Sequence, residues 1–212
     1  MNIIAHRGFW LKPEEKNTIE AFIKAFDSGH GVETDIRDDR GKLVISHDMP
    51  NGSELLFDDF LALLKGRNLP LAINIKSDGI INPLKDSLER FNIQNYFTFD
   101  MSFPESRKYI KNNLHPLLGL SEFHSLFFDQ TEYAGIWLDS FERDWFNEEL
   151  ILRWLNKLQD KPICIVSPEL HNRDHLPLWK MLKDANLHHK KAIAICTDYP
   201  DQADQFFNER SI

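Results

Sequence analysis

Two histidines, two cations and two carboxylates lie in or directly after short apolar runs near the start of the chain: His6, Arg7, Glu33, Asp35, His47 and Lys76. Histidine titrates near neutral pH, so one ring can accept a proton while the other donates one. Arginine binds an oxyanion with a two-pronged fork, and lysine binds it as a point charge. Together these residue types could stabilise an oxyanion and transfer a proton to or from a reacting group.

Glu33 and Asp35 are two residues apart in an otherwise apolar segment, so in a strand they would point to the same face. Two buried carboxylates repel each other and resist the loss of solvent unless a cation lies between them. An all-oxygen ligand set is typical of Mg²⁺ or Ca²⁺. The pattern therefore predicts a divalent cation at Glu33 and Asp35.

These residues require a scaffold that brings strand ends together. The apolar runs at 3–5 and 32–36 are joined by an amphipathic segment, 17–29, whose apolar residues recur at helical spacing. This is the pattern of a βαβ unit. In parallel α/β folds, ligands bind at the carboxyl ends of the strands. We therefore expect the polar residues to meet at one edge of the sheet.

The alternation of strands and helices continues to the end of the chain. It predicts an α/β protein, a single compact (β/α)8 TIM barrel formed by one domain over residues 1–212. Further strands are expected at 71–76, 96–99, 116–120, 135–138, 162–166 and 192–196, and helices at 55–64, 83–91, 104–112, 147–158, 176–185 and 201–208. The polar turn 37–41 and the run 43–46 predict a hairpin that extends the second strand and delivers His47 to the site.

The motifs, in order, are His6-Arg7-Gly8, Pro13-Glu14, Asn17-Thr18, Glu33-x-Asp35 and His47-Asp48. In this order and spacing they resemble the glycerophosphodiester phosphodiesterase family, whose pattern is His-Arg-Gly, Pro-Glu-Asn-Thr, Glu-x-Asp and His-Asp. The segments 74–76 and 196–200 resemble later family motifs. The resemblance implies a TIM barrel and a metal-dependent hydrolase of glycerophosphodiesters. It also implies that His6 and His47 are catalytic, one attacking or activating and the other protonating the leaving alkoxide.

The resemblance also assigns Arg7 and Lys76 to the substrate phosphate and Glu33, Asp35 and Asn74 to the metal. Asn74 departs from the family, which usually has a glutamate there, and an amide oxygen binds a metal without adding negative charge. A second departure is the pair Glu15-Lys16, which separates Pro13-Glu14 from Asn17-Thr18 and leaves two candidates for the family's glutamate. Asn17-Thr18 itself is expected to cap a helix.

Three further residues near predicted strand ends are candidates for contact with the substrate, namely Trp10, Asp139 and Glu169. Two alternatives to simple hydrolysis stay open. In the first, a substrate hydroxyl attacks the phosphorus and gives a cyclic phosphate, as in phospholipase C. In the second, the chain binds phosphodiesters without cleaving them, because Asn74 has weakened the metal site.

Composition limits the partners. The chain has 212 residues, a net charge of −8 and a pI near 5.6, and its Lys and Arg form no basic stripe, which argues against nucleic acid. Cys164 and Cys196 lie in apolar runs and are expected to be reduced core residues. No signal peptide or 18-residue apolar run is visible, so we expect no membrane insertion and a cytoplasmic location. The oligomeric state is left open.

Overall fold

The expected alternation of strands and helices is present in the computed structural model, which describes residues 1–124 and 132–208. The chain divides into two compact units. The N-terminal unit is Ala5–Pro116, and the C-terminal unit combines Met1–Ile4 with Leu117–Ile212. Strand β1 (Asn2–His6) contributes residues to both. The prediction of a single domain stays a prediction.

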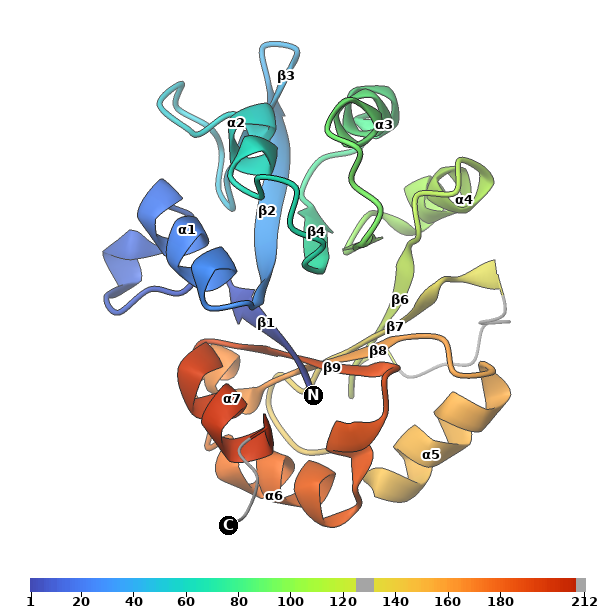
Figure 1. Cartoon of the computed structure of the whole chain (residues 1–212). Coiled ribbons are helices and arrows are strands. Elements are labelled where there is room, and N and C mark those ends of the chain that lie inside the picture. The colour runs from blue at the N-terminus through green and yellow to red at the C-terminus, as the bar shows by residue number, and fades with distance from the viewer. Residues whose placement is uncertain (125–131, 209–212) are drawn as a thin grey trace. The chain divides into compact units, whose positions relative to one another are not determined.

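The N-terminal unit is a parallel sheet with helices between its strands, in the order β5-β4-β2-β1, and β3 pairs antiparallel with β2 (Figure 1). Ser102 caps α4 with its hydroxyl, and Thr18 caps α1 in the same way, as expected from Asn17-Thr18. The elements after β1 are a 3-10 turn (Pro13–Glu15), α1 (Ile19–Asp27), β2 (Gly31–Asp39), β3 (Lys42–Ile45), α2 (Phe57–Ala62), β4 (Leu71–Ile75), α3 (Ile81–Arg90), β5 (Tyr96–Phe99) and α4 (Phe103–Lys111).

Strand β2 is longer than the sequence predicted. It continues through the polar residues to Asp39, which pairs with Lys42 of β3, so the turn is only Arg40-Gly41. Both turn residues have positive φ, 47° and 81°, as a tight hairpin turn with right-handed strand twist requires. The hairpin was predicted, but its turn was placed too early. Arg37 and Asp38 are polar and were assigned to the turn, whereas a half-exposed strand accommodates polar side chains.

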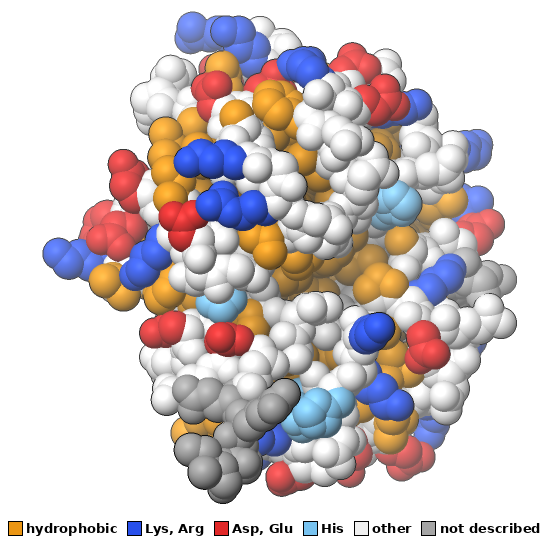
Figure 2. All heavy atoms as spheres, viewed as in Figure 1, with side chains coloured by type: hydrophobic (Ala, Val, Ile, Leu, Met, Phe, Trp, Pro, Cys, Tyr) orange, Lys and Arg blue, Asp and Glu red, His pale blue; other side chains and the backbone are white. Residues whose placement is uncertain are grey.

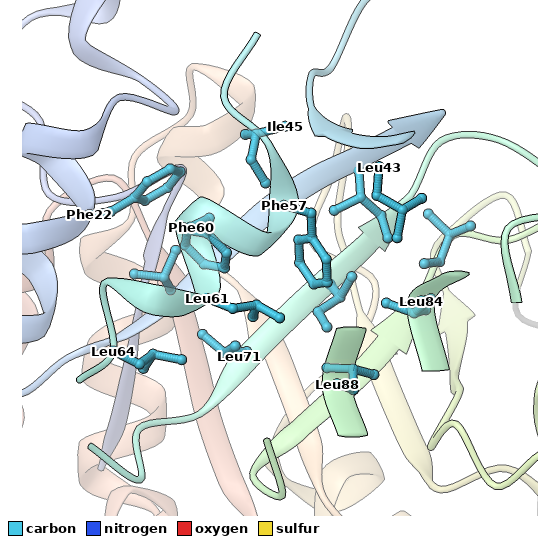
Figure 3. Close-up of a cluster of buried hydrophobic side chains, with 14 of the residues drawn as sticks. Phe22, Leu43, Ile45, Phe57, Phe60, Leu61, Leu64, Leu71, Leu84 and Leu88 are labelled. Atoms are coloured by element: carbon cyan, nitrogen blue, oxygen red, sulfur yellow. The ribbon is translucent and has the colours of Figure 1, made fainter. Parts of the chain in front are cut away.

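The core of the N-terminal unit fixes the orientation of β2. Figure 3 shows Phe57, Phe60 and Leu61 of α2 pointing toward the sheet, and the Phe22 and Phe60 rings meet edge to face with centroids 4.6 Å apart. Val32 and Ile36 of β2 belong to the same buried cluster. Because side chains alternate along a strand, this core packing places Glu33 and Asp35 on the opposite face.

The C-terminal unit repeats the alternation. Its strand order is β9-β8-β7-β6, and the first residues of β1 neighbour β9. Asn147 caps α5 by accepting a hydrogen bond from the amide of Leu150 at 3.0 Å. The elements are β6 (Leu117–Leu120), β7 (Gly135–Leu138), α5 (Glu148–Lys157), β8 (Ile163–Val166), a 3-10 turn (Pro168–His171), α6 (Leu176–Asp184), a 3-10 turn (Leu187–His189), β9 (Ile193–Thr197) and α7 (Pro200–Asn208).

The strand order and the strand-helix alternation are those of a TIM-barrel-like α/β fold, which confirms the predicted fold class. Cys164 and Cys196 are buried and free, as expected. Across the described ranges 1–124 and 132–208, no helix is long and apolar enough to cross a membrane. On the face that Figure 2 shows, Lys and Arg side chains are interspersed with Asp and Glu.

Candidate functional site

Three strands of the N-terminal unit carry the predicted metal ligands and phosphate-binding cations at or near their carboxyl ends. His6 ends β1, and the next residue, Arg7, donates its backbone N–H to the carbonyl of Glu33 at 2.9 Å. Strands β2 and β4 pair in parallel with Asp35 directly opposite Asn74. Residues opposite each other in a pair share a face, so Asn74 lies on the carboxylate face of β2.

Asp35 is the most heavily contacted carboxylate of the site. It is fully buried, and its Oδ2 lies 3.0 Å from Nε of Arg7, while its Oδ1 lies 3.6 Å from Nζ of Lys76. The Asn17 amide also donates to Oδ2 at 3.3 Å. Two cations therefore compensate the charge of Asp35, as the sequence argument required of a buried carboxylate pair.

The Arg7 contact is an ion pair without an aligned hydrogen bond. Nε of Arg7 is buried, yet no atom of the described residues accepts its hydrogen. Lys76 likewise approaches Asp35 and Asp100 at 3.6 and 3.8 Å, outside hydrogen-bond distance. Both cations thus keep donors that an additional oxyanion can accept.

Glu33 has a different environment from Asp35. Its side chain is 2% exposed, and its Oε2 lies 3.9 Å from Nε2 of His6. Burial raises the pKa of Glu33 well above its usual range, and the negative charge of Asp35 raises it further. Arg7, Lys76 and a hydrogen bond with the Asn74 side chain act in the opposite direction with smaller effects. Glu33 therefore holds a proton more readily than an exposed glutamate does.

Three oxygens of the predicted ligand set are buried without a hydrogen bond from any described residue: Oε2 of Glu33, Oδ1 of Asp35 and Oδ1 of Asn74. A buried acceptor left without a donor costs about 1–3 kcal/mol, so it is a place where a ligand gains free energy. Carboxylate and amide oxygens are the donors that Mg²⁺ and Ca²⁺ prefer. The three oxygens therefore fit a hard divalent cation.

A metal site in this unit depends on the side-chain amide of Asn74. No group of three His, Cys, Asp or Glu side chains in the described part of the chain is arranged to hold a metal ion. A site here would need Asn74 as its third protein ligand, with two formal negative charges instead of three.

The ring of His47 pairs with its neighbour in the chain and not with the buried carboxylates. Ser46 donates its N–H to the carbonyl of Asp35 at 3.0 Å, but His47, the next residue, turns its ring to Asp48, with Nδ1 and Oδ1 2.9 Å apart. Its side chain is 47% exposed and contacts neither Glu33 nor Asp35. The His47 contact lowers the pKa of Asp48. The role of His47 as the acid-base partner of His6 stays a prediction.

The turn after β1 is strained and tightly packed. Arg7 and Asn17 both have positive φ, 56° and 59°, and the N–H of Asn17 donates to the carbonyl of Arg7 at 2.9 Å. Gly8 has φ +90°, and a Cβ there would lie 2.8 Å from Cβ of Ala21 in α1. Only glycine fits between this turn and the helix, so the packing fixes where Arg7 leaves the strand.

Asn17 and Asp100 contribute to the site beyond what the sequence argument assigned them. Thr18 alone caps α1, while the Asn17 side chain donates to Asp35 and accepts a hydrogen bond from the Thr34 hydroxyl at 3.0 Å. Asp100, with φ 62°, pairs with Lys76. The signal for Asn17 was its place in the Asn-Thr motif, which was interpreted only as a cap.

The 3-10 turn Pro13–Glu15 and the indole ring of Trp10, which both follow β1, also have defined contacts. Glu15 accepts the N–H of Leu11 at 2.8 Å, whereas Glu14 is exposed. Trp10 donates its indole N–H to the carbonyl of His6 at 2.9 Å, and the ammonium of Lys16 lies 4.3 Å from the centroid of its ring. Trp10 therefore supports the end of β1, and its contact with a substrate stays a prediction.

The C-terminal unit holds the other two candidates for substrate contact. Asp139 follows β7 and pairs with Nε2 of His171 at 2.7 Å. Glu169 lies in the 3-10 turn after β8 and accepts hydrogen bonds from the Thr197 hydroxyl and from the N–H of Asp198. Both are largely buried side chains at strand ends.

Comparison with solved structures finds matches that cover nearly the whole chain. A glycerophosphodiester phosphodiesterase from Agrobacterium tumefaciens str. C58 matches with a TM-score of 0.68 and 16% identity, over 97% of this chain and 98% of that one. The chain has the fold of glycerophosphodiester phosphodiesterases. A phosphodiesterase from Oleispira antarctica, solved with the product sn-glycerol-3-phosphate, matches with a TM-score of 0.72 and 15% identity, over 99% and 97% of the two chains.

No protein-family model matches the chain, and no curated protein matches it. At 15–16% identity, the structural likeness concerns the fold. The assignment of chemistry to individual residues rests on the geometry described above.

Proposed function

We propose that the chain is a metal-dependent phosphodiesterase that hydrolyses a small glycerophosphodiester-like substrate to an alcohol and a phosphomonoester. The observation that carries the proposal is the set of three buried oxygens without hydrogen-bond donors, on Glu33, Asp35 and Asn74, beside Arg7 and Lys76. The fold shared with two phosphodiesterases supports it. So does the order of the His-Arg-Gly, Glu-x-Asp and His-Asp motifs.

In this proposal, Glu33, Asp35 and Asn74 hold Mg²⁺ or Ca²⁺, which when bound offsets the negative charge of the phosphoryl oxygens. Arg7 turns its unused donor from Asp35 toward one phosphate oxygen, and Lys76 acts as a point charge on another. Asn17 holds Asp35 in place, and Asp100 does the same for Lys76.

His6 and His47 exchange the protons in this proposal. His6 lies at the carboxylates, where Glu33 can orient and stabilise its protonated ring. His47 is exposed and paired with Asp48, so it would act after its ring turns toward the substrate. Which of the two attacks or activates, and which protonates the leaving alkoxide, is left to experiment.

The test is to incubate the purified chain with a panel of glycerophosphodiesters and resolve the products by ³¹P NMR. Each reaction is run with Mg²⁺, Ca²⁺ or Mn²⁺ and with EDTA, and Glu33→Gln serves as the matched inactive variant. We expect a phosphomonoester that appears only with metal. A cyclic phosphate as the sole product would support intramolecular attack instead. No turnover with any metal would support binding without catalysis.

A further inference from the structure

The segment between β3 and α2, residues 46–56, carries the one Asn-Gly pair of the sequence, Asn51-Gly52. Asn51, Gly52 and Ser53 are all exposed. An asparagine followed by glycine is chemically labile, because the glycine nitrogen can attack the side-chain amide carbon and no Cβ hinders it. The pair lies a few residues after His47 and takes no part in the metal site or the phosphate-binding cations described above.

The carboxylate of Glu54 lies against the nitrogen that would attack. Its Oε2 accepts the N–H of Gly52 at 2.9 Å, and its Oε1 accepts the N–H of Asn51 at 2.7 Å. Backbone hydrogen bonds, that of Asn51 above all, lower the pKa of Glu54, so the side chain is an ionised acceptor at neutral pH. A carboxylate that already holds the N–H of Gly52 can take its proton as the nitrogen attacks.

Ser53 holds the group that would be attacked, the side-chain carbonyl of Asn51. Oδ1 of Asn51 accepts two hydrogen bonds, from the Ser53 hydroxyl at 2.7 Å and from the Ser53 N–H at 3.1 Å. Negative charge gathers on this oxygen when the amide carbon is attacked, and two donors aimed at such an oxygen stabilise the intermediate. Ser53 therefore both holds and polarises the amide.

The segment leaves room around the attacking nitrogen. Gly52 has φ +97°, and a Cβ built there would lie more than 4 Å from any described residue other than its two chain neighbours. Because the pair is on the surface, water also reaches it, and water is consumed in the second half of the reaction. Asn113 offers a contrast, since it is exposed too but is followed by Leu114, whose side chain hinders attack.

We propose that Asn51 is a site of self-catalysed deamidation, in which Glu54 acts as the base and Ser53 stabilises the oxyanion. The Gly52 nitrogen forms a bond to Cγ of Asn51, and the Cγ–Nδ2 bond breaks. The proton lost from Gly52 passes through Glu54 to the leaving nitrogen, which departs as ammonia. Water then opens the five-membered imide at either carbonyl, so residue 51 becomes aspartate or isoaspartate. The site is independent of the proposed hydrolysis, because it uses neither metal nor phosphodiester.

The conversion changes the segment that carries His47. A carboxylate in place of the amide adds a negative charge close to Glu54, and like charges repel. Isoaspartate also inserts one more carbon into the main chain, which disturbs the hydrogen bonds that Glu54 and Ser53 make. Deamidation therefore weakens the contacts that hold this segment.

The experiment incubates the full chain in EDTA at neutral pH and follows the tryptic peptide 43–65 by mass spectrometry. Deamidation raises the mass of this peptide, and electron-transfer fragmentation distinguishes isoaspartate from aspartate. We expect residue 51 to convert at least about threefold faster in the folded chain than in the same chain in guanidinium chloride, because only the folded chain has the hydrogen bonds. Asn113 should keep its amide. Equal or slower conversion in the folded chain would overturn the proposal.

Variants separate catalysis by the segment from the lability of the pair itself. Glu54→Gln removes the base but keeps an acceptor oxygen, and Ser53→Ala removes one donor to Oδ1, so each should slow conversion at least about threefold. Glu20→Gln, on the exposed face of α1, is the matched control and should convert at the wild-type rate. Circular dichroism checks that each variant is folded. Wild-type or faster conversion in Glu54→Gln or Ser53→Ala would contradict the proposal, because the hydrogen bonds would then be idle or would restrain Asn51.

Discussion

The two units place carboxylates at strand ends in opposite electrostatic settings. In the N-terminal unit, Asp35 lies between two cations, Arg7 at 3.0 Å and Lys76 at 3.6 Å, and a second carboxylate lies two residues away. In the C-terminal unit, Glu169 is held by a hydroxyl and a backbone N–H, and Asp139 by a histidine and a backbone N–H. The first setting suits a cation together with an oxyanion, and the second suits neutral hydrogen-bond donors.

The difference shows that a buried carboxylate acquires its function from its partners. Carboxylates that lie beside permanent positive charge can hold a metal and a phosphate together, because the carboxylates bind the metal and the cations bind the anion. A carboxylate whose partners are neutral donors is already balanced, so its remaining oxygen selects hydrogen-bond donors.

The largest effect is expected from His6→Ala. Loss of a general acid or base costs roughly 10²–10⁴-fold in rate, so kcat should fall by that factor while the chain stays folded. His189→Ala in the C-terminal unit is the matched control and should retain the wild-type rate. The measurement is steady-state kinetics on the best substrate of the panel. A His6→Ala enzyme with wild-type kcat would remove His6 from the mechanism.

Gly8→Ala should lower the free energy of unfolding by roughly 2–3 kcal/mol, because the new Cβ meets Ala21 at 2.8 Å and φ is +90°. Gly79→Ala has a similar φ of +83° but open space, so it isolates the conformational cost of about 1 kcal/mol. Gly119→Ala in β6 meets nothing within 4 Å and should be nearly neutral. Urea denaturation measures all three. Equal losses for Gly8→Ala and Gly79→Ala would show that the turn is not tightly packed.

Stability without metal should fall as the pH rises, because of Glu33. The pKa of Glu33 is raised in the folded state above the usual 4.5. Between pH 4.5 and the raised pKa, the folded chain therefore keeps a proton that the unfolded chain has lost. The stabilisation that comes from this proton is complete below the pKa of the unfolded state and is lost as the pH rises through the pKa of the folded state. The free energy of unfolding then falls by at most about 1.4 kcal/mol per pH unit. Glu33→Gln removes this slope. Urea denaturation in EDTA across that pH interval measures it, and parallel curves for the two proteins would contradict the assignment.

Asn74→Glu should tighten divalent-cation binding about tenfold, because it restores a third negative ligand. Asn156→Glu adds the same charge on the exposed face of α5 and should not change the affinity. Calorimetric titration with Mn²⁺ compares the two variants with the wild type. Equal affinities in all three would mean that Asn74 is not a ligand.

The fold was largely predictable because its signals are local. The Val32 and Ile36 pattern and the amphipathic spacing of α1 identify elements without knowledge of their neighbours. The approach of Arg7, Asp35 and Lys76 followed from the rule that ligands bind at the carboxyl ends of parallel strands.

The orientation of side chains at the strand ends was not predictable in the same way. The ring of His47 turns to the adjacent Asp48, and Asn17 reaches Asp35 from a turn in which its φ is positive. Hydrophobic periodicity reveals neither contact. The pairing of Asp139 with His171 depends on a 3-10 turn that places residues 32 positions apart within 2.7 Å. Such contacts are set by tertiary packing rather than by sequence spacing.

The central claim is that Glu33, Asp35 and Asn74 bind a divalent cation. Mn²⁺ binding followed by electron paramagnetic resonance tests it most directly, with wild type, Glu33→Gln and Glu169→Gln measured side by side. We predict one bound Mn²⁺ in the wild type, a loss of at least about tenfold in affinity for Glu33→Gln, and wild-type affinity for Glu169→Gln. Equal Mn²⁺ affinity in wild type and Glu33→Gln would contradict the account.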